Sequence, residues 1–163
     1  MMALPVGPYL PTAPLVVVGW LSGVTGLNAG MVATTLPRDR AAWADEGFVQ
    51  ITMIPSTGPI ASGDARIAYV QIDAWAVRLE ANGVDVSSKR PVARAARLAE
   101  LIIRGCEDDA QGSRFGRPVT LPANYLAARA LSAWPLTEPT DVLDDPTGYA
   151  RTTFDLALTW ARL

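Results

Sequence analysis

Hydrophobic and polar positions alternate most regularly between Asp64 and Val77, where the sequence reads D-A-R-I-A-Y-V-Q-I-D-A-W-A-V. Successive side chains of a strand point to opposite faces. One face of this segment is therefore small and apolar, consisting of Ala68, Val70, Ile72, Ala74 and Ala76. The other face is mixed and carries Tyr69, Gln71, Asp73 and Trp75. The pattern predicts a central strand of an antiparallel sheet with a helix on its apolar face.

Further strands are expected on both sides of this segment along the chain. Hydrophobic runs that end at turn signals predict them at Met31–Leu36, Phe48–Ile54, Asn124–Trp134 and Tyr149–Trp160. The last of these alternates clearly. Its residues expected toward the core are Thr152, Phe154, Leu156, Leu158 and Trp160.

Two helices are predicted. The longer spans residues 91–106, with Pro91 suited to a first turn. Its apolar positions recur at helical spacing and form one stripe, made of Val92, Ala95, Ala96, Ala99, Ile102, Ile103 and Cys106. The three alanines would let it approach the apolar face of the central strand. A shorter helix is expected at Leu15–Leu21, with Pro14 in its first turn.

The order of these elements, strands and one long helix without βαβ repetition, predicts an α+β fold. We expect a mostly antiparallel sheet of about four to five strands, with the long helix packed on one face. Residues 1–14 would form an extended, proline-rich arm, and residues 15–163 a single domain.

The arm carries Pro5, Pro8, Pro11 and Pro14, one proline at every third position. Polyproline II has three residues per turn, so these rings would line one edge of an extended rod. Such an arm is a tail along the surface, a contact to a neighbouring subunit, or a ligand for an aromatic groove.

The amino-acid composition excludes several kinds of catalytic and metal site. The chain has 163 residues, a net charge of −2 and no histidine, which removes histidine-based triads and metal sites. The one cysteine, Cys106, is expected to be a small buried hydrophobe. No hydrophobic run approaches the roughly 20 residues of a membrane-spanning helix. We expect a soluble protein made in a reducing cytoplasm.

No phosphate-binding loop or nucleophile elbow occurs, and no cofactor is expected. Asp73 and Asp155 lie on the outward faces of two predicted strands, where each is expected to be solvated. The alternative is that both approach a shared Mg²⁺, as in a metal-dependent nuclease.

Aromatic residues on the second side of the predicted sheet suggest another role. Phe48, Tyr69 and Trp75 all fall there, where the N-terminal helix covers them or they form an association patch. With the arm prolines they make up the candidate subunit or partner interface: Pro5, Pro8, Pro11, Phe48, Tyr69 and Trp75.

The order of elements resembles tailed-phage (siphophage-type) tail terminator, or tail-completion, proteins. The resemblance covers nearly the whole chain and is a pattern without a catalytic signature. The stretches that carry it are Trp20-Leu21, Met31–Pro37, Gly47–Ile51, the Asp64 to Ala76 strand, the alanine-rich helix and Asp145–Asp155.

The resemblance implies a non-enzymatic virion protein at the head–tail junction, made in the host cytoplasm. It implies a ring, expected to be hexameric, that caps the tail tube, ends its polymerisation and joins it to the head-completion or stopper proteins. The major tail tube protein is then a partner, and DNA passes passively through the lumen. No membrane contact is implied. The mildly acidic charge agrees with a conduit that does not grip DNA.

Three alternatives stay open at this point. A stopper or adaptor is another connector that builds a ring from small α+β subunits. A nuclease would use Asp73 and Asp155, and a monomeric binding module would use the arm. The mass of the protein in solution distinguishes the ring hypotheses from the other two.

Overall fold

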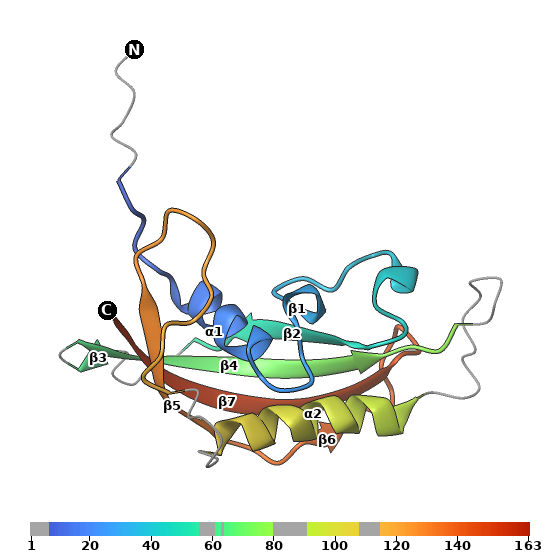
Figure 1. The fold of residues 1–163 in the computed structure, drawn as a ribbon. Coiled ribbons are helices and arrows are strands. Elements are labelled where there is room, and N and C mark those ends of the chain that lie inside the picture. Colours follow the sequence, from blue (N-terminus) through green and yellow to red (C-terminus); the bar gives the residue numbers. More distant parts are fainter. Residues whose placement is uncertain (1–6, 56–60, 63, 80–90, 108–114) are drawn as a thin grey trace.

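The computed structural model describes residues 7–55, 61–62, 64–79, 91–107 and 115–163 (Figure 1). It shows an α+β fold, which confirms the predicted fold class. The sheet is mixed, with one parallel pair of strands. The helices are α1 (Ala13–Ser22) and α2 (Val92–Cys106), with short 3₁₀ turns at Ala29–Met31 and Arg40–Ala42. The strands are β1 (Val32–Ala33), β2 (Phe48–Met53), β3 (Ala61–Ser62), β4 (Ala65–Ala76), β5 (Ala128–Pro135), β6 (Thr140–Asp141) and β7 (Ala150–Arg162).

The sheet is built around one long antiparallel ladder. The pairing of β4 with β7 runs from Ala65 opposite Ala161 to Ala76 opposite Ala150. The strand order is β1-β2-β4-β7-β5, with β3 added on β4 and β6 on β7. All these pairs are antiparallel except β1 with β2, which is parallel. The segment predicted to be a central strand is therefore confirmed as one, since β4 pairs with β2 on one side and with β7 on the other.

Most predicted strands form, with changes at their ends. β2, β4 and β7 match the expected segments closely. The predicted Met31–Leu36 strand shrinks to Val32–Ala33, because a 3₁₀ turn occupies its start. The predicted Asn124–Trp134 strand begins four residues later, at Ala128. The sequence pattern predicts neither two-residue strand, β3 nor β6. The sequence also predicts a polar link from Glu80 to Ser88, which lies outside the described residues.

Both helices pack on the same face of the sheet, which we call the covered face (Figure 1). One core cluster joins Val17 and Leu21 of α1, Ala99 and Ile102 of α2, and the strand residues that point toward them. Those strand residues include Val70, Ile72, Ala74, Phe154, Leu156 and Leu158, all buried. The predicted contact between the long helix and the apolar face of the central strand is therefore confirmed.

The buried stripe of α2 is rotated from the predicted one. Ala95, Leu98, Ala99, Ile102 and Gly105 are buried. Two residues of the predicted stripe, Val92 and Ala96, are instead exposed. Leu98 turns inward because it fills space beside Gly47, whose φ is +84°. A Cβ there would lie 2.6 Å from the Leu98 Cδ1 atom.

Helix α1 begins at Ala13, with Pro14 in its first turn, as expected for a proline that has no N–H to donate. Its place in the covered-face core corrects the expectation that it covers the aromatic residues of the opposite face. We call that opposite face the second face. Along each strand, the side chains that alternate with those of the covered face point to the second face. They include Tyr69, Asp73 and Trp75.

Candidate functional site

A buried ion-pair cluster lies on the second face. The Arg151 Nε donates to Asp73 Oδ1 at 2.9 Å, and its Nη1 donates to Asp145 Oδ2 at 3.2 Å. The side chains of Asp73 and Asp145 are 5% and 2% exposed, and that of Arg151 is 23% exposed. The guanidinium also lies 5.1 Å from the centroid of a Trp75 ring. Two buried carboxylates are thus compensated by a single arginine.

This cluster shifts two pKa values. Burial alone would raise the pKa of Asp145, but hydrogen bonds from Thr147 and the charge of Arg151 lower it below the usual aspartate value. Burial alone would lower the pKa of Arg151, but its two carboxylate partners raise it. The Thr147 backbone N–H and hydroxyl both donate to Asp145. The cluster therefore fixes the segment that leads into β7.

The cluster corrects the prediction that Asp73 is a solvated sheet residue. Asp73 is buried and ion-paired, and Gln71 Nε2 donates to both of its carboxylate oxygens. Asp155 lies opposite Gln71 in the ladder, two positions along from the pair that Asp73 forms with Thr153. Among the described residues no group of three or more potential metal ligands gathers. The carboxylate that the nuclease hypothesis needs is thus held by Arg151.

The aromatic residues expected on the surface are mostly covered. Phe48 and Trp75 are buried with Trp43 and Val77 in a second hydrophobic cluster. Trp43 comes from the Arg38–Glu46 region, which the sequence pattern describes only as charged loop. Neither an exposed patch at Phe48 and Trp75 nor a cover by α1 is therefore correct. Burial removes these two residues from the monomer surface.

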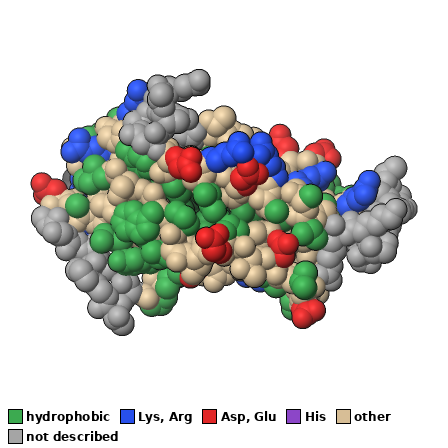
Figure 2. Space-filling view, turned by 90° about the horizontal axis from the view of Figure 1, so that it is seen from below, with side chains coloured by type: hydrophobic (Ala, Val, Ile, Leu, Met, Phe, Trp, Pro, Cys, Tyr) green, Lys and Arg blue, Asp and Glu red, His purple; other side chains and the backbone are tan. Residues whose placement is uncertain are grey.

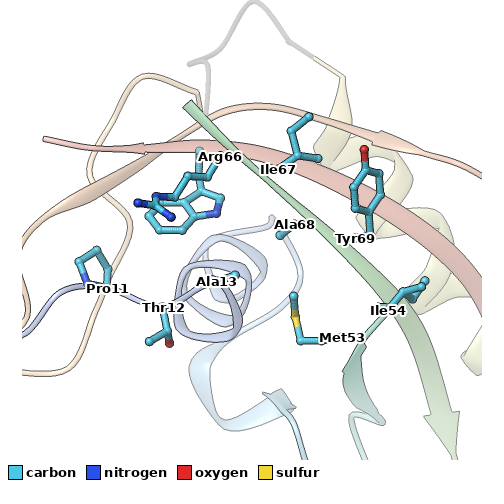
Figure 3. Close-up of a pocket in the computed structure, with 10 residues that line it drawn as sticks. Pro11, Thr12, Ala13, Met53, Ile54, Arg66, Ile67, Ala68 and Tyr69 are labelled. Atoms are coloured by element: carbon cyan, nitrogen blue, oxygen red, sulfur yellow. The ribbon is translucent and has the colours of Figure 1, made fainter. Parts of the chain in front are cut away.

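A cavity of about 270 Å³ lies at the other end of β4 (Figure 3). Its walls come from the start of α1, the end of β2 and the start of β4: Pro11, Thr12, Ala13, Met53, Ile54, Arg66, Ile67, Ala68, Tyr69 and Trp160. Arg66 contributes the one charged side chain of this lining, and it lies 5.9 Å from the centroid of a Trp160 ring. We call this site the Arg66 cavity.

The Arg66 cavity adjoins a polar hollow of about 310 Å³ that shares Arg66 and is otherwise lined by Asp64, Arg162 and Leu163. Among the described residues neither arginine forms an ion pair with a carboxylate. An apolar recess next to two arginines and one aspartate suits an apolar group that has an acidic neighbour.

The predicted arm contacts the domain. Tyr9 N donates to the Asn124 carbonyl at 2.6 Å, and Leu126 N donates to the Tyr9 carbonyl at 2.8 Å. Pro8 is exposed, whereas Pro11 is buried and lines the Arg66 cavity. Pro5 lies outside the described residues. The candidate interface role of these prolines stays a prediction.

Exposed hydrophobic side chains gather toward the β5–β7 side, which Figure 2 shows as hydrophobic groups with separate acidic ones among them. Trp134 is 40% exposed and Leu136 46% exposed. On the second face Ala157 lies between Trp134 and Tyr69 in the ladder and is fully buried by this position. Tyr69, which the sequence predicts at an interface, is thus half-buried. It lies in one cross-strand row with Ala157 and the exposed Trp134.

Among the residues that the structure describes, Leu143 is the most exposed large hydrophobic one, at 73%. It follows β6 and precedes the buried Asp145, and its neighbour Asp144 is exposed as well. From the sequence, Asp144 and Asp145 are predicted only to serve solvation or turn formation, and Leu143, Arg66 and Arg151 are not singled out. The one available signal is a leucine followed by two aspartates in a segment with three prolines.

Cys106, expected to be a small buried hydrophobe, is half-buried in α2. Burial, with a smaller contribution from Glu107, raises the pKa of its thiol to about 12. The thiol is therefore protonated at neutral pH and lies 3.4 Å from the Ile102 carbonyl oxygen.

No protein-family model matches this chain, and no curated protein matches its sequence. Within the described residues, no helix has the length and apolar character to cross a membrane.

Proposed function

We propose that this protein is a structural virion subunit, a tail terminator that assembles into a ring at the end of a phage tail tube. The observation that carries the proposal is the exposure of three large hydrophobic side chains, Trp134, Leu136 and Leu143. Exposed apolar groups of this size, framed by polar residues, are typical of surfaces that bind other proteins. The resemblance of the element order supplies the kind of assembly.

The fold supports the proposal in a second way. A terminator subunit has to keep its shape between two different partners, the tube below and the connector above. The long β4–β7 ladder and the buried Arg151 cluster provide such a rigid frame. The proposed partners are copies of this chain, the major tail tube protein and the head-completion proteins.

The test is a tube-capping assay. The tail tube protein of the same phage is polymerised with and without this protein, and tube lengths and ends are measured by electron microscopy. We expect shorter tubes that each end in a ring. Unchanged tube lengths, with no protein at the tube ends, would contradict the proposal. Binding to filled heads in place of tubes would identify a stopper or adaptor.

A further inference from the structure

The two ends of the β4–β7 ladder carry complementary surfaces. The ladder runs from Ala65 to Ala76 of β4. The 11 spacings between these residues, at about 3.3 Å each, give a length of about 36 Å. The Arg66 cavity lies at the end where Ala65 pairs with Ala161. The Leu143 tip, which we define as Leu143 and Asp144, lies next to the opposite end, where Ala76 pairs with Ala150.

The Leu143 tip is held in place from both sides. On one side Val142 N donates to the Arg151 carbonyl at 2.9 Å. On the other side Asp145 is buried and receives hydrogen bonds from Thr147 and Arg151. Hydrogen bonds thus hold Val142 and Asp145, the residues on either side of the tip, while the Leu143 side chain stays exposed. Such a preorganised group loses little conformational entropy when it docks.

The cavity is large enough for the apolar tip, and the charges beside the two are opposite in sign. An apolar cavity of about 150 Å³ already accommodates benzene, so the 270 Å³ of the Arg66 cavity leave room for a leucine side chain. An acidic residue directly follows Leu143, and two arginines and one aspartate stand beside the cavity. An oppositely charged neighbour at the rim adds orientation and specificity to an apolar contact.

We propose that the Leu143 tip of one copy docks into the Arg66 cavity of the next copy, with Asp144 facing Arg66 and Arg162. The proposal rests on the proposed function, because it supplies the contact between ring subunits. Each copy carries one tip and one cavity at opposite ends. A contact between two different surfaces is heterologous, and it generates a closed ring when the rotation between copies closes.

The experiment uses two variants that each lose one surface. The tip variant combines Leu143→Ser with Asp144→Arg, and the cavity variant is Arg66→Glu. Both changes lie at exposed or half-buried positions, so thermal unfolding serves as the check that each variant folds. Leu126→Ser is the matched control, because it removes an exposed leucine that belongs neither to these two surfaces nor to the exposed residues of the proposed function. Mass in solution is measured by light scattering and native mass spectrometry.

The wild type and Leu126→Ser are expected to form the same closed oligomer. Each single-surface variant should associate at least about tenfold more weakly, since it loses the apolar contact or reverses the charge. A 1:1 mixture of the two variants should stop at a heterodimer, because it contains one intact tip and one intact cavity for each pair. Combining Asp144→Arg with Arg66→Glu in one chain should restore the oligomer.

Different failures have different meanings. Variants that assemble like the wild type would overturn this contact and leave the ring function standing. A wild type that remains monomeric at all concentrations would overturn the contact as well. Rings that form as described but do not cap tail tubes would contradict the proposed function and support the contact.

Discussion

The two faces of the sheet differ in how much of each is buried and in what buries it. The covered face is closed by two helices and consists of aliphatic and aromatic side chains such as Ile72 and Phe154. The second face is half-buried over most of its length. Toward the end where Ala76 pairs with Ala150 it buries Asp73 beside Arg151, and the loop residue Trp43 covers the same end. Packing stabilises the first face through apolar area, whereas the second face depends on charges that must compensate one another.

Removing Arg151, the cation of the ion-pair cluster on the second face, is expected to lower the free energy of unfolding most. Arg151→Ala leaves two buried carboxylates without their cation, which typically costs about 3–5 kcal/mol. Urea or thermal unfolding measures the loss. Arg104→Ala is the matched control, because Arg104 pairs with Glu100 on the exposed side of α2 and such pairs contribute about 0–1 kcal/mol. Equal stability of the two variants would show that the buried pair contributes no more than a surface pair.

This difference explains how far the sequence alone could go. The covered face follows from period-two alternation in β4 and β7, so its residues were predictable one by one. Asp73 and Arg151 are 78 residues apart, and nothing near either residue announces the other. A sequence pattern reports which positions avoid water, but it does not report which charged side chains meet across strands.

The stripe of α2 shows the same limit within the covered face. Alanines lie on two sides of this helix, so small size alone does not say which side is buried. Leu98 decides the rotation through its contact beside Gly47, a residue 51 positions away in the sequence. The candidate surfaces were missed for a related reason. Arg66 and Arg162 come together only because β4 pairs with β7.

A change on the covered face should have the next largest effect. Ala99 is buried between α2 and the sheet, so Ala99→Phe overpacks this contact at a cost of about 1–3 kcal/mol. Ala96→Phe is the matched control, since Ala96 lies on the same helix but is exposed. Thermal unfolding of the pair isolates the packing effect from helix propensity. If both variants melt together, α2 does not press on the sheet at Ala99.

Acid should weaken the second face before it affects the covered face. The pKa of Asp145 is lowered in the folded protein, so Asp145 stabilises the fold at pH values above its unfolded pKa of about 4. This contribution disappears as the pH falls through the lower, folded pKa. The free energy of unfolding, measured from pH 7 to pH 2, should therefore fall less steeply for Asp145→Asn than for the wild type. Parallel curves would show that Asp145 does not couple to folding.

The smallest effect on stability is expected for Trp134→Ala, which sharpens the comparison because Trp160 lies on the opposite face. Trp134 is 40% exposed on the second face, where a cross-strand pair contributes about 0.2–1 kcal/mol. Trp160 is 3% exposed on the covered face, where truncation to alanine costs about 3–5 kcal/mol. Thermal unfolding of both variants gives the contrast in stability, and the tube-capping assay gives the contrast in function. Under the proposed function, Trp134→Ala should fold normally but bind tubes more weakly, since it removes exposed apolar surface without disturbing the core. A Trp134→Ala protein that caps tubes as well as the wild type would assign the exposed tryptophan no part in the assembly.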